Sequence, residues 1–288
     1  MPFFYILLLV WKECPLVDWV SLLKACSQRI RGEVLGFFGS AEASVAFGVG
    51  AGGDAMKKID LEAEKALTET LGDYGVSYTL ISEEAGIKKV GAKPKEFYVT
   101  VDPVDGTTNA IRGLPFMATS IAVSRAPNLQ DIEVALVTDL FHNVTYIAKR
   151  GCGALRNERK ISPSRTSSLE ESVIGVDLNT FKIRELVDSL VPVLGEAKHI
   201  RHLGANALEI CYVADGTTDA FIDIRGKLRT TDIAAAYLIL REAGGIMVTP
   251  GGMEMNVPLA PTQRVSFIAA ANTSIYNKIM ELLTPIKY

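Results

Sequence analysis

The 288-residue sequence predicts a layered α+β fold. Segments with helical and strand-like patterns come in blocks: two amphipathic helices, then a run of five strands, then a second part that mixes both types. Such blocks favour separate layers of helices and sheets over a regular alternation of strand and helix. Hydrophobic residues make up 48% of the chain and charged residues 22%, which is the composition of a globular protein with a substantial core.

The first part of the chain supplies two helices and five strands. Apolar residues at helical spacing predict helices over residues 16–38 and 57–71. Between them a glycine-rich stretch, 48–53, precedes Asp54, and we expect a flexible surface loop there. Strand-like patterns follow at residues 76–81, 97–101, 118–123, 134–139 and 144–148.

The second part of the chain alternates the two types. The predicted elements are a strand at 172–177, helices at 183–194 and 206–214, a strand at 220–224, a helix at 233–242, a strand at 265–270 and a closing helix from Thr273. A stretch rich in serine and proline at 162–168 indicates a boundary between two subdomains, 1–165 and 166–288.

Bulk properties narrow the class of partner and compartment. A formal net charge of −3 does not indicate a nucleic-acid-binding protein. The apolar segment 1–11 is shorter than the about 20 residues that span a bilayer, and it lacks the features of a secretory signal; an extra strand, a tail or an early translation start all fit it. Four cysteines without a CxxC spacing favour reduced thiols in a cytoplasmic protein.

The motif most informative about chemistry is Asp102-Pro103-Val104-Asp105-Gly106-Thr107-Thr108-Asn109. It comes directly after the predicted strand 97–101, so its acids emerge at the C-terminal end of a strand, a usual place for ligands in open α/β layers. Proline fixes φ and glycine permits a tight turn. Two carboxylates three residues apart can therefore converge on one point, and the carbonyl of Val104 can turn the same way.

Converging carboxylates need a positive partner. At an effective dielectric constant near 20, two like charges 4 Å apart repel by about 4 kcal/mol. A hard divalent cation relieves this repulsion, and oxygen ligands favour magnesium, manganese or calcium over zinc. The competing interpretation is a solvated turn in which Asp102 and Asp105 only accept hydrogen bonds from backbone amides.

A second pair of acids, Glu83 and Glu84, follows the predicted strand 76–81. If this strand pairs in parallel with strand 97–101, Glu83 lies beside Asp102. A solvated pair of glutamates at a strand exit is the alternative.

Two further acids stand at predicted helix starts. Asp232 precedes the helix predicted from Ile233, where an N-cap is the ordinary interpretation. Asp60 lies one turn into the helix 57–71, where an exposed polar side chain is usual. Together with the strand-end acids, these two acids favour a metal site over a set of unrelated polar positions.

The chain resembles the inositol monophosphatase family, in particular archaeal members that also act on fructose 1,6-bisphosphate. The resemblance covers about residues 16 to 284. It rests on motifs in a fixed order: Ile59-Asp60, Ser82-Glu83-Glu84, Asp102 to Asn109, Gly151-Cys152-Gly153-Ala154, and Asp232 with Glu242-Ala243-Gly244-Gly245.

This resemblance implies a layered αβαβα sandwich of the sugar phosphatase type with two or three Mg²⁺ ions, for which Mn²⁺ can substitute. Carried over by position, the first ion is held by Glu83, Asp102 and the Val104 carbonyl. The second is held by Asp102, Asp105 and Asp232. Most of these ligands fall in the N-terminal subdomain.

The resemblance also assigns the reaction. Asp60 and Thr107 orient and deprotonate the attacking water, with Glu83 as a further catalytic residue, and the amides of Gly106 and Thr107 hold phosphate oxygens. Asp54 after the glycine-rich stretch approaches a third ion.

The C-terminal subdomain carries the residues that match the family's substrate pocket: Gly204, Ala205, Asn206, Glu209 and Asp223. Asp223 stands where animal inositol phosphatases have glutamate.

Arg225, Lys227 and Arg229 form a basic cluster in the sequence directly after Asp223, and Arg225 is a candidate contact for a second phosphate. The alternative is a solvated basic loop.

The expected function is therefore a magnesium-dependent phosphoric monoester hydrolase acting on inositol 1-phosphate, fructose 1,6-bisphosphate or both. Resemblance to the family also implies a homodimer, without nucleic-acid or membrane partners. Alternatives are an adenosine 3′,5′-bisphosphate phosphatase of the same superfamily and a non-catalytic regulatory member. A haloacid-dehalogenase-type phosphatase needs D-x-D-G-T, a spacing that D-x-x-D-G-T does not match.

Overall fold

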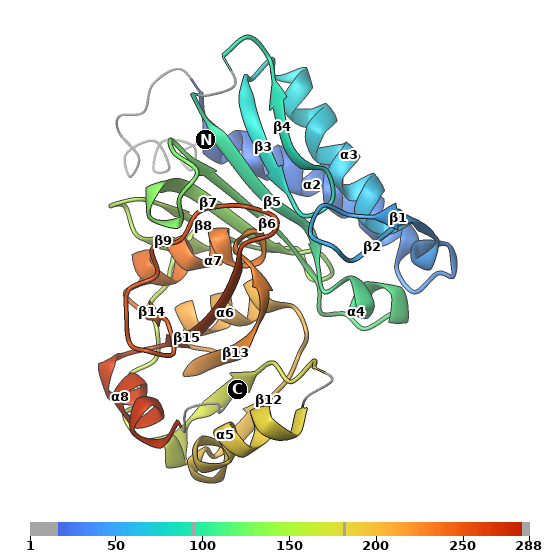
Figure 1. The fold of residues 1–288 in the computed structure, drawn as a ribbon. Helices are drawn as coiled ribbons and strands as arrows, with labels where there is room; N and C mark the ends of the chain where they lie inside the picture. Colours follow the sequence, from blue (N-terminus) through green and yellow to red (C-terminus); the bar gives the residue numbers. More distant parts are fainter. Residues whose placement is uncertain (1–16, 94–95, 181–182, 284–288) are drawn as a thin grey trace.

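The computed structural model describes residues 17–93, 96–180 and 183–283 (Figure 1). Its helices are α2 (Trp19–Phe37), α3 (Lys58–Asp73), α4 (Thr107–Arg112), α5 (Ile183–Glu196), α6 (Asn206–Ala214), α7 (Thr230–Ala243) and α8 (Thr273–Leu282). The apolar segment 1–11 and Cys14 lie outside the described residues. Among the helices that are described, none combines the length and apolar content needed to cross a bilayer.

An eight-stranded sheet forms the larger layer, in the order β10-β9-β8-β7-β6-β5-β3-β4. Its strands are β3 (Tyr78–Ser82), β4 (Gly86–Val90), β5 (Tyr98–Asp105), β6 (Ala118–Ser124), β7 (Ile132–Asp139), β8 (Val144–Lys149), β9 (Ala154–Arg156) and β10 (Arg159–Lys160). Only the pair β3 and β5 within this sheet is parallel. That pairing decides where the strand-end acids lie.

A five-stranded sheet forms the smaller layer, in the order β12-β11-β13-β15-β14. Its strands are β11 (Val173–Val176), β12 (His199–Arg201), β13 (Ala220–Arg229), β14 (Ile246–Val248) and β15 (Arg264–Ala270). A separate hairpin joins β1 (Ala46–Val49) and β2 (Ala55–Lys57) around the glycine-rich stretch.

Among the described residues, three apolar cores hold the layers together. One core joins α2 and α3 to one face of the larger sheet, and a second encloses α6 and α7 between the two sheets. A third joins α5 and α8 to the outer face of the smaller sheet. The layers therefore run helix, sheet, helix, sheet, helix (Figure 1), and the αβαβα prediction is confirmed.

Helix α7 occupies the middle of this stack because its sequence is apolar almost all round. Every residue from Ile233 to Leu240 is buried, as expected for a helix covered on all sides. Its first turn is thereby held between the two sheets, and this fixes the position of Asp232, which lies in that turn.

The predicted elements are found with shifted ends. The strand β4 was not anticipated, because Gly86–Val90 carries two lysines and pairs only with β3 at the edge of the sheet. The strand predicted at 220–224 continues to Arg229 as β13, and α7 begins at Thr230. The division at residue 165 stays a prediction, although each sheet draws its strands from one side of it.

The glycine-rich stretch differs from the surface loop that we predicted. Gly50 and Gly52 are buried, and the amides of Ala51 and Gly52 donate to the carbonyls of Glu84 and Glu83 at 3.0 and 2.8 Å. The stretch is thus packed onto the end of β3.

Leu67 provides a test of the core under the site. Its side chain is fully buried on α3, in the core with α2 and the larger sheet. Leu67→Ala is expected to lower the free energy of unfolding by about 2–5 kcal/mol through lost burial and a residual cavity. Val49→Ala, at a position 73% exposed, should change it by less than about 0.5 kcal/mol. Denaturant titration of both variants measures the difference, and equal losses would contradict the packing described.

Candidate functional site

Glu83 and Asp102 lie side by side because their strands are parallel. Ser82 at the end of β3 is in register with Val101 of β5, so the next residue on each chain is an acid at the same edge of the sheet. The conditional prediction made from the sequence, that parallel pairing would place Glu83 beside Asp102, is confirmed by this register.

A β-bulge explains how the DPVDG motif turns. Against β6, Asp102 pairs with Ser120 and Asp105 with Ala118, which leaves one extra residue on β5. In a regular strand, residues three apart point to opposite faces. A bulge re-aims the side chains, and both acids are buried.

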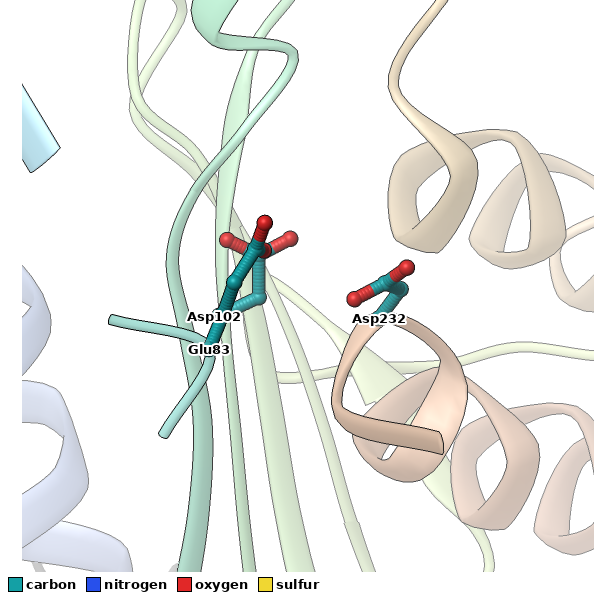
Figure 2. A group of neighbouring side chains, drawn as sticks. All are labelled: Glu83, Asp102 and Asp232. Carbon is teal, nitrogen blue, oxygen red and sulfur yellow. The ribbon is translucent and has the colours of Figure 1, made fainter. Parts of the chain in front are cut away.

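Asp232 reaches the same point from the opposite side. It is the third residue of α7, and its Oδ2 accepts a hydrogen bond of 2.8 Å from the amide of Arg229. It therefore lies inside the helix and is not the N-cap. Figure 2 shows its carboxylate facing those of Glu83 and Asp102.

These three acids form a candidate metal site. One carboxylate oxygen from each of Glu83, Asp102 and Asp232 lies within 4.8 Å of the other two. Carboxylate oxygens from three separate elements, with nothing softer among them, fit a hard divalent cation.

Burial and mutual repulsion disturb the ionisation of the cluster. Burial, and then the charge of Asp232, raises the pKa of Glu83 to about 9. Burial, followed by the charges of Glu83 and Asp105, raises the pKa of Asp102 well above its ordinary value. The pKa of Asp232 is also raised by burial, although Arg229 opposes the shift. The protein itself thus leaves negative charge here incompletely compensated.

Asp105 has a different set of partners. Its two oxygens accept hydrogen bonds from the amides of Asn206 and Ala207 at 2.9 and 2.7 Å, at the start of α6. It is outside the three-acid group, yet burial and the charge of Asp232 raise its pKa to about 7. It therefore links the metal site to the helix that carries Asn206.

Asp60 and Thr107 form a pair beside this cluster. The Thr107 hydroxyl lies 2.8 Å from Asp60 Oδ1 and 2.9 Å from the Val104 carbonyl oxygen, so it can donate to either. Asp60 is the third residue of α3, buried, and its Oδ2 accepts from the amide of Lys57. Burial raises its pKa to about 6, and the hydrogen bond from Thr107 opposes the rise.

The turn at Gly106 brings the two parts of the site into contact. Gly106 precedes α4 with a φ of 88°, and a Cβ there would lie 3.1 Å from that of Ala205 and 3.2 Å from the Gly204 carbonyl. Glycine is therefore required by both backbone conformation and space. The Asn109 side chain adds hydrogen bonds of 2.8 Å to the carbonyls of Phe116 and Leu203.

Glu209 supports the segment with Gly204 and Asn206. Its carboxylate accepts a hydrogen bond of 2.9 Å from the amide of Gly204, and burial raises its pKa to about 8. The Asn206 side-chain oxygen is buried and has no hydrogen-bond partner in the described part of the chain.

Asp223 and Arg225 are paired with each other and with Asp177. The Arg225 side chain is 5% exposed, its Nη2 lies 2.6 Å from Asp177 Oδ2, and its Nε donates to Asp223 Oδ1 at 3.0 Å. Burial raises the pKa of Asp223 and the arginine opposes that shift. Arg225 thus carries a charge that two buried carboxylates already neutralise.

The sequence did not single out Asp177 or assign Arg229 to the acidic cluster. Asp177 directly follows β11, the same strand-end position that identified Asp102, so that signal was available. Arg229 appeared only in a basic run, whereas its Nη1 lies 2.7 Å from Glu83 Oε1. Asp54 pairs with the same guanidinium and is outside the three-acid group.

Comparison with known proteins agrees with this geometry. The model of the inositol monophosphatase family matches residues 20–287. The chain belongs to the inositol monophosphatase family. It is therefore a phosphoric monoester hydrolase by family, and the metal dependence of that family agrees with the acidic cluster of Glu83, Asp102 and Asp232.

Individual relatives within the inositol monophosphatase family give finer comparisons. The fructose-1,6-bisphosphatase/inositol-1-monophosphatase of Methanothermobacter thermautotrophicus is 36% identical over 283 residues, covering 96% of this chain and 100% of the relative. The bifunctional NADP phosphatase/NAD kinase of Methanococcus maripaludis is 34% identical; the match covers 92% of this chain and 49% of that protein, so the chain spans about half of its length.

A solved structure supports the fold of this family member. An inositol monophosphatase-fructose 1,6 bisphosphatase superposes with a TM-score of 0.82 at 30% identity, covering 93% of this chain and 100% of the other.

The acidic cluster should make stability depend on pH and on divalent ions. Carboxyls with a raised folded-state pKa favour the folded protein fully at pH values below their unfolded pKa of about 4, and that contribution is lost as the pH rises through the folded values, about 7 for Asp105 and 9 for Glu83. With a chelator, the melting temperature should therefore fall between pH 5 and 9.

Mg²⁺ should reverse that fall most strongly at high pH. At pH 8.5 we expect Mg²⁺ to raise the melting temperature by at least about 5 °C, which corresponds to about one or two kcal/mol in the free energy of unfolding of a protein of this size. At pH 5 we expect almost no rise. Thermal melts with Mg²⁺ and with EDTA measure it, and Asp102→Asn is the control that should reduce the gain. An equal gain at both pH values would contradict the electrostatic account.

Proposed function

We propose that the protein is a Mg²⁺-dependent phosphatase that hydrolyses a phosphate monoester of a small sugar or polyol by attack of water. The observation that supports this most is the meeting of Glu83, Asp102 and Asp232 within 4.8 Å, next to a buried acid, Asp60, that is hydrogen-bonded to Thr107. This arrangement combines a cation site with a proton acceptor.

Two or three Mg²⁺ ions are expected, with Glu83, Asp102 and the Val104 carbonyl for one, and Asp102, Asp105 and Asp232 for another. Mn²⁺ should substitute because it accepts the same oxygen ligands. Bound divalent ions lower the pKa of water and offset charge on phosphoryl oxygens.

The chain's own residues supply proton transfer and orientation. In this proposal Thr107 Oγ1 holds the attacking water and passes its proton toward Asp60 Oδ1, 2.8 Å away. A buried acceptor with a pKa of about 6 suits this role near neutral pH, since an effective general base has a pKa close to the working pH.

Phosphate oxygens would be held by the amides of Gly106 and Thr107, which open α4. Their N–H groups are the unsatisfied donors of a helix start. The nearby Gly204, Ala205 and Asn206 would hold the alcohol part, and the buried, unpartnered Asn206 Oδ1 is suited to accept a hydrogen bond from a substrate hydroxyl.

Inositol 1-phosphate and fructose 1,6-bisphosphate are the substrates that we favour, because the M. thermautotrophicus relative carries both activities in its name. NADP is a second candidate, since the M. maripaludis relative is named for an NADP phosphatase. Adenosine 3′,5′-bisphosphate and a non-catalytic regulatory role remain the alternatives. We further propose a cytoplasmic homodimer.

Phosphate release tests the function. Wild-type protein should release phosphate from one or more of these esters with Mg²⁺ and none with EDTA. Asp102→Asn should lower kcat by more than the roughly 100-fold that loss of a supporting outer-shell group can cost, since it removes a ligand itself. An exposed-site variant, Glu69→Gln, serves as control. A folded, Mg²⁺-loaded protein inert on the whole panel would favour the regulatory alternative.

Arg225 tests the choice between the two favoured substrates. If its guanidinium also contacts a second phosphate, Arg225→Ala should raise KM for fructose 1,6-bisphosphate by about 10-fold or more, the order of one charge-assisted hydrogen bond, and should leave inositol 1-phosphate less affected. Asp177→Asn, which frees the arginine from one carboxylate, should not weaken the bisphosphate. Equal losses on both substrates would assign Arg225 a structural role.

A further inference from the structure

The side chain of Arg229 lies inside the acidic cluster. It is 7% exposed, and its Nη1 lies 2.7 Å from Glu83 Oε1 and 3.9 Å from Asp232 Oδ2. Its Nη2 also pairs with Asp54. The guanidinium thus contacts two of the three acids that form the candidate metal site.

Local structure fixes this position from both sides. The backbone amide of Arg229 donates to Asp232 Oδ2 at 2.8 Å, which ties the residue to the first turn of α7. The ion pair with Glu83, the residue after β3, directs the side chain at the end of that strand. Since arginine stays protonated in proteins, the positive charge is present at every working pH.

The same guanidinium also donates hydrogen bonds to the backbone of the glycine-rich stretch. The Gly52 carbonyl accepts from Arg229 Nε and Nη2 at 3.4 and 3.3 Å, and from Arg264 Nη2 at 2.7 Å. A Cβ at position 52 would lie 2.3 Å from Arg229 Nε. Glycine is therefore needed here because the backbone packs directly on the arginine.

We propose that Arg229 is a built-in counter-cation that competes with a divalent ion for Glu83, so that it stabilises the ion-free site and weakens ion binding. The inference rests on the metal site of the proposed function. Its basis is that Glu83 Oε1 is paired with the guanidinium at 2.7 Å, whereas Mg²⁺ binds carboxylate oxygens at about 2.0–2.1 Å. The two cations draw on the charge of the same carboxylate and repel each other, so the presence of one weakens the binding of the other.

Metal titration without substrate measures this competition. Mn²⁺ is titrated calorimetrically into EDTA-treated, dialysed full-length wild type, Arg229→Gln and Arg229→Lys. Arg229→Gln is expected to bind Mn²⁺ at least about 10-fold more tightly, a change of 1.4 kcal/mol. Arg229→Lys, which keeps the charge but loses the planar fork, should fall between the two.

Arg264→Gln is the matched control. Arg264 reaches the same Gly52 carbonyl, yet within the described residues it has no ion pair with Glu83 or Asp232. Its charge does favour the ionised form of Asp232. Because Arg264 makes no direct ion pair with the cluster and its charge is partly screened by solvent, Arg264→Gln is expected to increase Mn²⁺ affinity by less than about 3-fold. A gain equal to that of Arg229→Gln would show that loosening of the loop, and not direct competition, controls affinity, and would overturn the proposal.

A second measurement uses the wild-type chain and does not need a glutamine variant that folds. In protein labelled with ¹⁵N-arginine, the Arg229 Nε–H signal, assigned by its loss in Arg229→Lys, should shift as Mg²⁺ is added. An unchanged signal while calorimetry records binding would overturn the proposal, as would weaker or equal Mn²⁺ binding by Arg229→Gln. A KM increase in that variant without tighter metal binding would instead identify Arg229 as a phosphate ligand.

The outcomes separate this inference from the proposed function. Tighter metal binding by Arg229→Gln in a chain inert on all phosphate esters would keep the inference and reject the phosphatase. Equal binding in an active enzyme would reject the inference alone. Absence of Mn²⁺ binding in every variant would reject both.

Discussion

The site depends on one constraint: several carboxylates that repel one another are held together in a buried space. One solution recurs in the chain, the placement of an acid at the start of a helix. Asp60 and Asp232 both occupy the third position of a helix, and each accepts a hydrogen bond from the amide three residues earlier. Backbone donors and the positive end of the helix dipole favour negative charge at that position. Asp105 is stabilised in a similar way by the first amides of α6. Each of these acids is thus partly compensated by a helix start, whereas Glu83 and Asp102 lie at strand ends, where no such dipole is available.

The layered fold is what brings helix starts and strand ends to one place. The larger sheet ends in acids where β3 and β5 run parallel. Helices α6 and α7 of the middle layer begin beside these acids, since Asp105 accepts from the first amides of α6 and Asp232 lies in the first turn of α7. Helix α7 is held there by apolar side chains on every face. The favourable burial of these side chains, about 25 cal/mol per Å² of apolar surface, is the term that can offset repulsion in the site. The core and the site are therefore coupled through the first turn of α7.

The sequence predicts those parts of this arrangement that depend on local pattern. Strand periodicity and the DPVDG turn were enough to place Asp102 at the end of its strand. For Glu83 the sequence supports only a conditional position, because the parallel pairing of the two strands is a contact that the structure supplies. Two other features depend on contacts between residues far apart in the sequence. Arg229 looks like a member of a solvated basic run, and its burial is decided by Glu83 and Gly52, more than 140 residues away. Likewise the glycine-rich stretch resembles a loop in composition, but Gly52 is required by the side chain of Arg229 packed against it.

The balance of charge explains why an anionic substrate would need added cations. Within the described part of the site, Arg229 is the basic side chain that contacts the acidic cluster, and Arg225 is already paired with Asp177 and Asp223.

A phosphate dianion placed at Gly106 would still face Asp102, Asp105 and Asp60. Protonation of some of these acids would lessen the repulsion but would also remove the proton acceptor that attack by water requires. Divalent cations resolve both demands, since they neutralise the carboxylates without protonating them. Arg229 also lessens the repulsion without protonating the acids, but its single charge leaves no surplus positive charge to attract phosphate. This asymmetry is the reason to regard the arginine as a competitor of the metal and not as its substitute.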